Sequence, residues 1–539
     1  MFTRRDILKA FLGLPVALAA CKSLSRTDGI DGRIVGASNE VGHILRERRR
    51  FEVPQHVWKE VNTVIVGGGI AGLSAAWKLK RQGFSDFLLL ELEDRAGGTS
   101  ASGSSELVSY PWGAHYLPVP FAENEDLVEL LDEMRLIEGK GEAGELRIYE
   151  QFLTRDPEER IYHKGRWYEG LYLYAGATEE DLRQYNDFYS EVGKWINWRD
   201  SDGRRAFTVP VSSCSTDAEV TALDKISFAE WLQNKGFNSE RLIWYCDHAS
   251  RDDYGLTLGQ TSAWAGLFYF CSRVQEAGEE SQSFITFPEG NGRFVNHFVS
   301  KIKKNLQGSS MAAEIIPTED GAEVVYLDTK TRSVNGIRAK NVIYSAPMYT
   351  AGYLIRGFNE SMPFDPGEFR HNAWFVANLF LKERPTNRFV RDFPLSWDNV
   401  LYDSPSLGYV TATHQKGIDY GPTVLTYYYP MAEDDLRAGM QKLLSLDWQE
   451  LADICLTDLE RAHENIREAT ERIDIMRWGH AMISPRTGFL WGDERKKAQK
   501  PFRNIHFAHS DLSGIAIFEE AFHHGLSAAN KIGKTGWTG

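Results

Sequence analysis

The feature that most constrains this chain is a glycine-rich turn near its start. An apolar run from Val64 to Val66 leads into Gly67, Gly69 and Gly72, and an alanine-rich segment of helical pattern continues to Gln82. In a G-x-G-x-x-G turn the first glycine permits the tight bend, the second lets the backbone approach a pyrophosphate, and the third allows close helix–strand packing. The segment therefore predicts a strand–turn–helix unit that binds a dinucleotide.

A second strand and an acidic residue complete this unit. Phe87 to Leu90 are apolar, and Glu91 follows nineteen positions after Gly72, where a carboxylate accepts hydrogen bonds from ribose hydroxyls. The helix is expected from Leu73 to Gln82, and its N-terminus offers free N–H groups and the positive end of its dipole to the phosphates, with Ile70 and Ala71 of the turn among the expected cofactor contacts. A glycine turn without a nucleotide is the weaker interpretation, because the whole unit is present. We expect an α/β fold with a Rossmann-like domain.

Composition narrows the remaining classes of protein. Of 539 residues, 42% are hydrophobic and 25% are charged, which is ordinary for a globular protein of several domains. Lys and Arg number 61 against 75 Asp and Glu, and the resulting formal charge of -14 repels a polyphosphate backbone. We therefore expect no nucleic-acid partner. The chain also has no internal period, which argues against a solenoid or a propeller.

Residues 1–21 have the pattern of a targeting segment rather than of a fold element. Arg4 and Arg5 precede an apolar stretch from Ile7 to Ala20, which is too short to span a membrane, and Cys21 follows directly. The segment resembles a twin-arginine export signal that ends in a bacterial lipoprotein cleavage box. The resemblance implies export in the folded state by the twin-arginine machinery, and a lipidated Cys21 that anchors the protein to the membrane in the periplasm. The alternative is an amphipathic helix with a chance cysteine.

The next segment, residues 22–55, is polar and irregular and is expected to be a tether. It contains Arg46 and a basic run from Arg48 to Arg50. These cations would suit anionic lipid headgroups, and a solvated run of charge is the equally good alternative.

Neither the cysteines nor the histidines predict a metal site. The cysteines after the export segment show no metal-ligand spacing and are expected to be free thiols: Cys214, Cys246, Cys271 and Cys455. One group of side chains near the C-terminus does stand at helical i, i+4 spacing: Glu519, Glu520, His523 and His524. We reject a metal there because no third ligand is indicated.

A specific family resemblance appears directly after the second strand. Glu91, Arg95, Gly97 and Gly98 stand in the pattern E-x-x-x-R-x-G-G. Behind a G-x-G-x-x-G unit, this pattern resembles the flavin amine oxidase superfamily, which includes amine oxidases, protoporphyrinogen oxidases and phytoene-type desaturases. The resemblance implies FAD, with Gly97 and Gly98 bringing backbone against the pyrophosphate and ribityl chain and Arg95 adding positive charge.

Further stretches resemble the superfamily in the same order, and they are Phe287 to Arg293, Ala339 to Pro347, Arg477 to Trp478, Ile505 to Asp511 and Phe518 to Ala521. The resemblance implies an FAD-binding domain built from residues 56–120, 283–350 and 470–539, and a mixed α+β substrate domain from 121–282 and 351–469. Phe518 and either Ser510 or Asp511 are expected to contact the flavin. The family has a glycine and an acid after the Phe-Ala pair, whereas this chain has His509 and Ser510 there.

The substrate half departs from the amine oxidase pattern. Such enzymes often carry a lysine on a substrate-domain strand, but the strand from Trp374 to Lys382 has its lysine at the far end and Asn378 in the usual region. His115, Tyr428 and His480 are the candidate catalytic residues, because each falls in a segment expected near the flavin or the substrate. The alternative for each of the three is an ordinary packing role.

The function expected from these features is that of an FAD-dependent oxidoreductase, in which a substrate carbon gives a hydride to flavin N5. Oxidation of a small amine is the first choice, with noncovalent FAD. A dehydrogenase or desaturase of a lipid-like, isoprenoid substrate is the second. A third hypothesis is a non-enzymatic flavin lipoprotein that transfers electrons. The sequence leaves the oligomeric state and the electron acceptor open.

Overall fold

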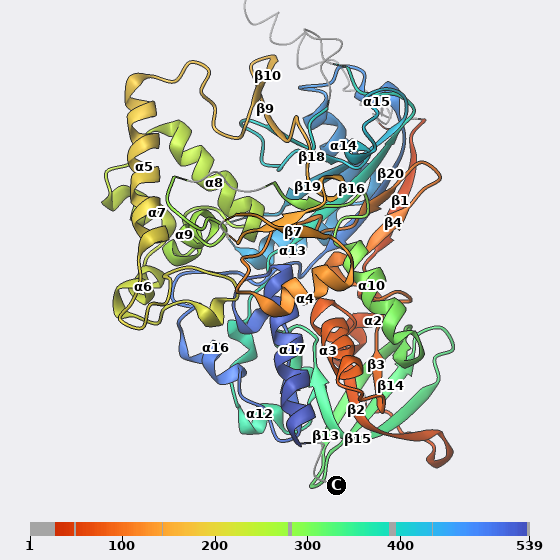
Figure 1. Ribbon diagram of the computed structural model, residues 1–539. Coiled ribbons are helices and arrows are strands. Elements are labelled where there is room, and N and C mark those ends of the chain that lie inside the picture. Colours follow the sequence, from red (N-terminus) through yellow and green to blue (C-terminus); the bar gives the residue numbers. More distant parts are fainter. Residues whose placement is uncertain are drawn as a thin grey trace, which may run out of the picture.

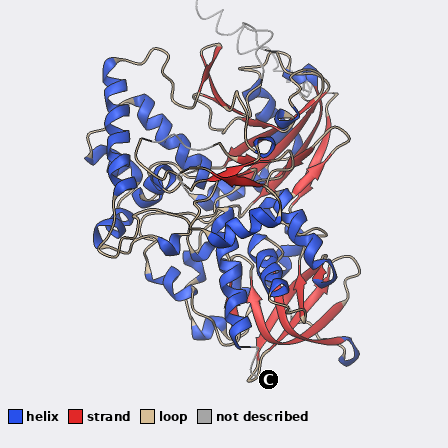
Figure 2. Ribbon diagram, viewed as in Figure 1, coloured by secondary structure: helices blue, strands red, loops and turns tan. Residues whose placement is uncertain are grey.

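The computed structural model describes residues 27, 29–47, 50–142, 144–278, 283–386, 395–433 and 435–535. The predicted export segment, with Arg4, Arg5 and Cys21, lies outside the described residues. Two sheets organise the molecule, one low in Figure 1 and the other high, and a group of helices lies beside the upper sheet. We call the two parts the nucleotide lobe and the substrate lobe. Figure 2 shows that each sheet is accompanied by helices.

The nucleotide lobe contains a seven-stranded sheet. Its strand order is β12 (Leu306–Gln307), β3 (Phe87–Leu90), β2 (Trp58–Val66), β15 (Val334–Tyr344), β14 (Ala322–Asp328) and β13 (Ser310–Pro317), and β21 (Ile505–Phe507) also pairs with β15. The strands β12, β3, β2, β15 and β21 run parallel, and β13 and β14 are antiparallel additions. This sheet gathers strands from three distant stretches of the chain, so the predicted Rossmann-like α/β fold built from discontinuous segments is confirmed.

Three helices cover one face of this sheet: α3 (Ile70–Arg81), α10 (Gly292–Ile302) and α17 (Phe518–Thr535). Trp77 of α3 packs its ring against Phe298 and Phe522, each at a centroid distance of 5.9 Å. The helices α3 and α17 approach so closely that a Cβ on Gly525 would lie 2.3 Å from the Ala71 carbonyl oxygen. Buried apolar residues fill this interface, which anchors the C-terminal segment to the glycine-rich turn.

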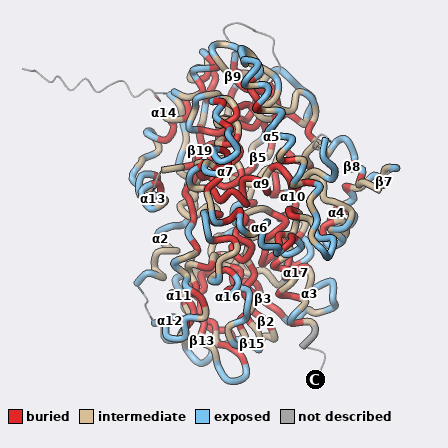
Figure 3. Tube along the Cα trace, turned by 90° about the vertical axis from the view of Figure 1, so that its left-hand side faces the viewer, coloured by how far each residue is buried: buried red, intermediate tan, exposed pale blue. Residues whose placement is uncertain are grey.

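The substrate lobe contains an eight-stranded mixed sheet. Its order is β1 (Asp31–Gly36), β20 (Thr470–Trp478), β16 (Trp374–Leu381), β19 (Thr423–Pro430), β18 (Tyr409–Thr411), β17 (Asp398–Leu401), β9 (Glu159–His163) and β10 (Arg166–Glu169). Helices α13 (Leu436–Ser445) and α14 (Trp448–Leu459) pack on it through Leu443, Leu451 and Leu456. Figure 3 shows buried chain running through the centre of both lobes.

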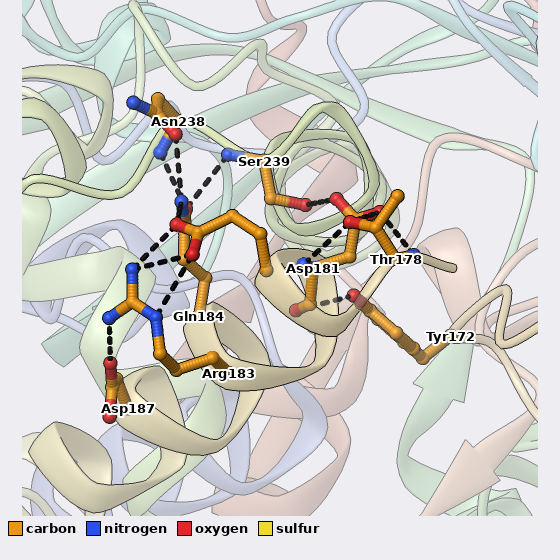
Figure 4. A network of polar contacts seen from close by, with 9 residues as sticks. Tyr172, Thr178, Asp181, Arg183, Gln184, Asp187, Asn238 and Ser239 are labelled. Atoms are coloured by element: carbon orange, nitrogen blue, oxygen red, sulfur yellow. Dashed lines mark hydrogen bonds and ion pairs between the residues drawn. The ribbon is translucent and has the colours of Figure 1, made fainter.

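A helical layer stands beside the upper sheet, made of α5 (Glu179–Asn197), α7 (Phe228–Asn234), α8 (Glu240–Tyr254) and α9 (Ala263–Cys271). Figure 4 shows how α5 and α8 are joined at their N-terminal ends. Thr178 and Asp181 form a capping box on α5, and Asp181 also accepts a hydrogen bond from Ser239 Oγ at 2.7 Å. Gln184 donates to Asn238 Oδ1 at 2.7 Å. These polar contacts fix where α8 begins, and α8 carries residues of the site described below.

The structure corrects the expected tether at residues 22–55. Its second half contains β1, an edge strand that runs parallel to β20 in the upper sheet. Ser38 then donates from its backbone N–H and from Oγ to Glu93 of the nucleotide lobe, at 2.8 and 2.7 Å. The described part of this segment is therefore built into both lobes. Of its basic residues, Arg48 and Arg49 lie outside the described residues.

Two predicted domain boundaries also differ from the observed packing. β20 belongs to the substrate sheet although residues 470–539 were expected to be FAD-binding. Helix α4 (Glu125–Glu133) packs Leu127, Leu130 and Leu131 into the nucleotide lobe although it was expected in the substrate domain. The prediction of free thiols is confirmed, because the four described cysteines are buried and unpaired. Among the described residues, no helix is both long enough and apolar enough to cross a membrane.

Candidate functional site

The glycine-rich turn joins β2 to α3 and leaves its middle open. Gly67 has a φ of +106°, and a Cβ there would lie 2.9 Å from the Ser345 carbonyl oxygen. A Cβ on Gly72 would lie 1.9 Å from the Gly67 carbonyl oxygen, so only glycine allows this close helix–strand contact. At Gly69, by contrast, no heavy atom lies within 4 Å of the Cβ position. The turn thus has the space through which a pyrophosphate would approach the backbone.

Glu91 follows β3 and holds its carboxylate beside this turn. Oε2 accepts from the Gly68 backbone N–H at 2.7 Å, and Oε1 accepts from the Glu93 backbone N–H at 2.8 Å. Burial raises the pKa of Glu91 to about 7, against the lowering effect of these N–H donors. A carboxylate accepts about four hydrogen bonds, so Glu91 retains capacity to accept from a ribose hydroxyl.

The second glycine pair lies against the first turn. Gly97 and Gly98 have φ values of +139° and +55°, and the Gly97 N–H donates to the Gly68 carbonyl oxygen at 2.8 Å. A Cβ on Gly98 would lie 3.4 Å from the Gly69 Cα. Arg95 is exposed and makes no hydrogen bond or ion pair within the described part of the chain. Its guanidinium is therefore available to an anionic ligand.

The structure separates the roles of Ser510 and Asp511. Asp511 is fully buried and accepts from His371 Nε2 at 3.0 Å and from the Met348 N–H at 2.9 Å. The positive charge available on His371 and His509 holds the pKa of Asp511 far below its usual range despite burial. The carboxylate of Asp511 is thus bound by groups of the protein itself. The Ser510 hydroxyl has no partner among the described residues and is the better placed of the two to meet a cofactor.

Three other predicted cofactor contacts place their side chains in the core. Ile70 and Ala71 are buried in the first turn of α3. Phe518, in the first turn of α17, packs its ring on Phe294 at 4.7 Å and on Phe522 at 6.0 Å. These three residues can therefore offer a cofactor only their backbone N–H groups, at the positive ends of two helices.

The residues present fit a dinucleotide cofactor. Besides the open space at Gly69, the buried hydroxyl of Ser345 has no hydrogen-bond partner among the described residues, and Ser345 lies directly against Gly67. An unpaired buried hydroxyl needs a partner that the described protein groups do not supply. Gly69, Glu91, Arg95, Gly97, Gly98, Ser345 and Ser510 are the residues that would hold the group.

Two of the three catalytic candidates lie together. The rings of His115 and Tyr428 have a centroid distance of 4.9 Å, and Trp397 lies 5.4 Å from His115. Tyr428 Oη donates to the Gly113 carbonyl oxygen at 2.8 Å, which ties β19 to the segment after the second glycine pair. Burial lowers the pKa of His115 to about 4, so this imidazole is neutral at pH 7. Tyr116 and Phe284 extend the group, and we call these five rings the aromatic cluster.

The third candidate, His480, lies elsewhere. Its ring packs on Tyr349 at 4.4 Å and faces His371 at 6.2 Å, and it makes no ring contact with His115 or Tyr428. Burial, then the charges of His371, Arg46 and His43, lower its pKa to about 4. The structure therefore groups His480 with the Asp511 ion pair and not with the aromatic cluster.

Asn378 of β16 stands in the region where amine oxidases often carry a lysine, and here its side chain has a structural role. It is fully buried, its Nδ2 donates to the Pro111 carbonyl oxygen at 3.0 Å, and its Oδ1 accepts from Thr426 Oγ1 at 2.7 Å. Both ends of the amide are used within the protein. Asn378 therefore fixes β16 against the segment that carries His115, which is a structural role.

Sequence reasoning missed a group of acidic residues beside the aromatic cluster. Glu159 begins β9, Asp252 lies on α8 and Asp398 begins β17. Burial and the neighbouring carboxylates raise the pKa of Glu159 and of Asp252 to about 7 and that of Asp398 well above its ordinary value. Burial and the charges of Asp398 and Asp252 raise the pKa of Tyr428 in turn, so these acids adjoin the predicted site. No local pattern marks them, because three separate elements supply them.

One cation adjoins these acids. Arg273 pairs with Asp253 at 3.3 Å and approaches the Tyr116 hydroxyl at 3.4 Å. Its buried Nε has no hydrogen-bond partner among the described residues. The guanidinium is thus committed to Asp253, and the pKa of Arg273 lies well above its ordinary value because of the surrounding negative charge.

The acidic and histidine side chains of α17 serve the fold. Glu520 accepts from the Val211 N–H at 2.7 Å and also from Ser513 Oγ, while His524 Nε2 lies 2.7 Å from the same hydroxyl. His523 lines a separate surface groove of about 930 Å³, on which none of the three catalytic candidates lies. A small cavity elsewhere borders both His115 and Trp397.

Comparisons with known proteins agree with this architecture. A family model described as an NAD(P)-binding Rossmann-like domain matches residues 65–134. No curated protein sequence matches the chain. Among solved structures, putrescine oxidase bound to putrescine is 16% identical, with a TM-score of 0.64 over 88% of this chain and 99% of that one.

Two further solved structures are similar. Cyclohexylamine oxidase from Brevibacterium oxydans IH-35A is 14% identical, with a TM-score of 0.60 over 88% of this chain and 99% of that one. A CLA-producing fatty acid isomerase from P. acnes is 15% identical, with a TM-score of 0.61 over 89% of this chain and 99% of that one. At these identities the likeness establishes a shared fold, and function must be argued from the site.

Proposed function

We propose that the protein is an FAD-dependent oxidoreductase that oxidises an amine. The glycine cradle, Glu91 and Arg95 support a dinucleotide cofactor, and the pattern of Arg95, Gly97 and Gly98 favours FAD over a nicotinamide. A bound FAD, held by Gly69, Glu91 and Arg95, would supply an acceptor for the two electrons of the hydride that leaves the carbon next to the amine nitrogen, after the ammonium group has released a proton to water. The product is an imine, which water hydrolyses to an aldehyde and an amine or ammonia.

The protein residues would bind and orient the substrate. The faces of Tyr428 and Trp397 suit an ammonium group, since aromatic faces attract cations. Neutral His115 adds no competing positive charge there. The single observation that carries the proposal is the packing of Tyr428, His115 and Trp397 at ring distances of 4.9 and 5.4 Å, where the negative charge of Asp398 and Asp252 acts on Tyr428. Such a combination selects a cationic substrate over a neutral one.

The test uses the purified protein and its own cofactor. The cofactor released by heat is identified by chromatography and mass, and we expect FAD. The holoprotein is then mixed without oxygen with primary amines and, as matched controls, with the corresponding neutral alcohols. We expect at least one amine to bleach the flavin and no alcohol to do so. Bleaching by the alcohols, or by no amine, would remove amine oxidation from consideration.

A lipid-like substrate is the second candidate. It is favoured by the structural role of Asn378 where amine oxidases often carry a lysine, and by the similarity in fold to a fatty acid isomerase. The carboxylates of Asp252 and Asp398 argue against a lipid-like substrate, because an apolar chain would bring no positive charge to them. Bleaching by an isoprenoid or fatty acid but not by any amine would establish this candidate.

We also propose that the mature protein is a periplasmic lipoprotein exported in the folded state. The order of Arg4, Arg5, an apolar stretch and Cys21 supports this. Replacement of Cys21 by Ser is expected to move the protein from the membrane fraction to the soluble fraction of the bacterium. A protein that stays in the membrane fraction after this change would contradict the proposal.

A further inference from the structure

The imidazole of His371 has a hydrogen-bond acceptor at each of its two ring nitrogens. Nδ1 lies 3.1 Å from the Phe369 carbonyl oxygen, and Nε2 lies 3.0 Å from Oδ1 of Asp511. A carbonyl oxygen can only accept, so Nδ1 carries a proton. The side chain of His371 is 3% exposed, so water does not take the place of either partner. The state of Nε2 therefore decides whether this buried ring is neutral or an imidazolium.

The carboxyl group of Asp511 determines the state of that nitrogen. Its Oδ2 accepts from the Met348 backbone N–H at 2.9 Å, and its Oδ1 lies 3.0 Å from Nδ1 of His509 as well as 3.0 Å from Nε2 of His371. Hydrogen-bond donors and neighbouring positive charge favour the ionised form of a carboxyl group. An ionised carboxylate only accepts, so Nε2 of His371 also carries a proton. The two buried side chains are thus an imidazolium and a carboxylate.

Another buried histidine of this chain shows the ordinary neutral state. His248 is 7% exposed and stacks on Trp244 at a centroid distance of 5.2 Å, and burial lowers its pKa to about 4. A charge on a buried ring is costly unless an opposite charge compensates it. His371 is buried to a similar degree but faces Asp511, so the carboxylate is what allows its ring to keep a charge.

The pair joins three segments that lie far apart in the chain. His371 belongs to the segment that leads into β16, where it forms a backbone bridge with Ile483. Met348 follows β15 of the nucleotide sheet, and Asp511 lies in the loop between β21 and α17. The carboxylate of Asp511 therefore fixes its own loop both to the end of β15 and to the segment that enters the substrate lobe.

Two hydroxyl groups assigned above to the cofactor site lie on the segments that this pair joins. Ser510 directly precedes Asp511, and Ser345 lies three residues before Met348 and against Gly67. Neither hydroxyl has a hydrogen-bond partner among the described residues. A polar group without a partner in a buried site needs one from a ligand. A shift of the loop at Asp511 would change the spacing of these two hydroxyls, and with it the fit of a cofactor.

We propose that His371 and Asp511 form a charged ion pair and that His371 is a positioning residue for the cofactor. The imidazolium holds the carboxylate, the carboxylate holds the Met348 N–H and its own loop, and the loop presents Ser510. No proton and no electron is transferred in this role. The charge of the pair depends on the protein alone, whereas the positioning role rests on the proposed FAD cofactor.

The charge is tested by nuclear magnetic resonance on the full chain as purified. Its histidines are labelled with ¹⁵N, and the chemical shifts of the ring nitrogens are recorded at about pH 7.5, where an isolated histidine is mostly neutral. We expect both ring nitrogens of His371 to carry a proton and one ring nitrogen of His248 to lack one. The signals are assigned by their loss in His371→Gln and in His248→Gln. A neutral ring at His371 would overturn the ion pair.

The positioning role is tested by the affinity for FAD. The cofactor is removed and added back, and the Kd is measured by flavin fluorescence in the wild type, in His371→Gln, in Asp511→Asn and in the double variant. We expect each single variant to weaken binding by about tenfold or more, because it leaves a buried charge without its partner. The double variant pairs two neutral amides and should recover most of this loss, as expected for side chains that act as a unit.

His248→Gln is the matched control for the loss of a buried histidine. His248 lies on α8 and contacts Trp244, and neither residue belongs to the segments that the pair joins. This variant should bind FAD as tightly as the wild type. A loss of affinity equal to that in His371→Gln would mean that any buried histidine has this effect, and would overturn the positioning role.

The outcomes separate this inference from the proposed function. If the wild type contains no FAD and binds none, the proposed function fails, and the nitrogen spectra still decide the ion pair. If both single variants bind FAD as tightly as the wild type, the positioning role is wrong and the proposed cofactor stands. If the losses in the single variants simply add in the double variant, the two side chains act independently and the pair is wrong. If a single variant unfolds while the double variant folds, thermal unfolding supports the pair.

Discussion

The two lobes of this molecule build their sites in different ways. In the nucleotide lobe, the turn from Gly67 to Gly72, Glu91 and the pair Gly97 and Gly98 follow one another closely along the chain and meet at one edge of one sheet. In the substrate lobe, Glu159, Asp252 and Asp398 arrive from two strands and a helix. A cofactor site made by one βαβ unit is local in sequence, whereas a substrate site depends on the topology of the whole lobe.

The largest expected effect is the loss of flavin when the glycine-rich turn of the nucleotide lobe is blocked. Gly69→Val introduces a side chain into open space, so the protein should fold while the pyrophosphate loses its approach. We expect the flavin content of the purified protein to fall by about tenfold or more, as measured by the ratio of flavin to protein absorbance. Gly259→Val is the matched control, because the Cβ position of Gly259 is also open and lies away from the turn. Normal flavin content in Gly69→Val would contradict the assignment of the cradle.

Substitutions in the substrate lobe should lower activity while the protein keeps its flavin. Tyr428→Ala removes a wall of the aromatic cluster and is expected to lower kcat/KM for an amine by about tenfold to a hundredfold. Tyr428→Phe loses only the hydrogen bond to the Gly113 carbonyl oxygen, so about a fivefold loss is expected. Both variants should retain the flavin, which its absorption spectrum checks. A parallel loss of flavin would mean that the two sites are not separable.

The acids of the substrate lobe should make the thermal stability of the protein depend on pH. Glu159 and Asp252 have folded pKa values of about 7, above those of the unfolded chain. Between pH 5 and 7 these two groups hold protons in the folded state that they have released in the unfolded state, so their contribution to stability falls as pH rises through this window. Buried histidines such as His115 and His480, with pKa values lowered to about 4, contribute in the opposite direction. The wild type is therefore compared with Asp252→Asn by scanning calorimetry, and we expect the Tm of the wild type relative to that of the variant to decrease by a few degrees from pH 5 to pH 7. A difference in Tm that stays constant or rises over this window would contradict the raised pKa of Asp252.

The smallest effect is expected at His480. Its ring packs on Tyr349 and not on the aromatic cluster. His480→Ala should therefore change kcat/KM for an amine by less than about threefold and leave the flavin content unchanged. Steady-state kinetics measure kcat/KM. A loss as large as that in Tyr428→Ala would mean that His480 lies at the reacting centre.

The sequence predicted the fold better than it predicted the site. β3 and α3 fall within a few residues of the predicted strand and helix, because glycine spacing and apolar runs are local signals. β1 was missed, because one short edge strand in a polar segment has no pattern of its own. Tyr428 and His115 were named from nearby motifs and do meet. The acids whose charge acts on Tyr428, Asp252 and Asp398, were not predictable, because the pairing of β17 with β9 and the position of α8 beside them depend on the topology of the whole lobe.

The loop at Ser510 and Asp511 shows a second limit of sequence reasoning. In this chain the acid, Asp511, stands one position later than in the family pattern, so the sequence left open whether Ser510 or Asp511 faces the cofactor. The answer depends on His371 and on the Met348 N–H, which lie far away in the chain and both bind Asp511. No local pattern contains that information, since it arises where β15 and the segment before β16 pack on the C-terminal segment.

The most direct test of the proposed amine oxidation is a crystal structure of the chemically reduced holoprotein soaked with an amine that bleaches the flavin. The account predicts electron density for the flavin ring beside His115 and for the amine beside Tyr428. Density for the flavin ring beside His480, or for the amine away from Tyr428, would contradict it.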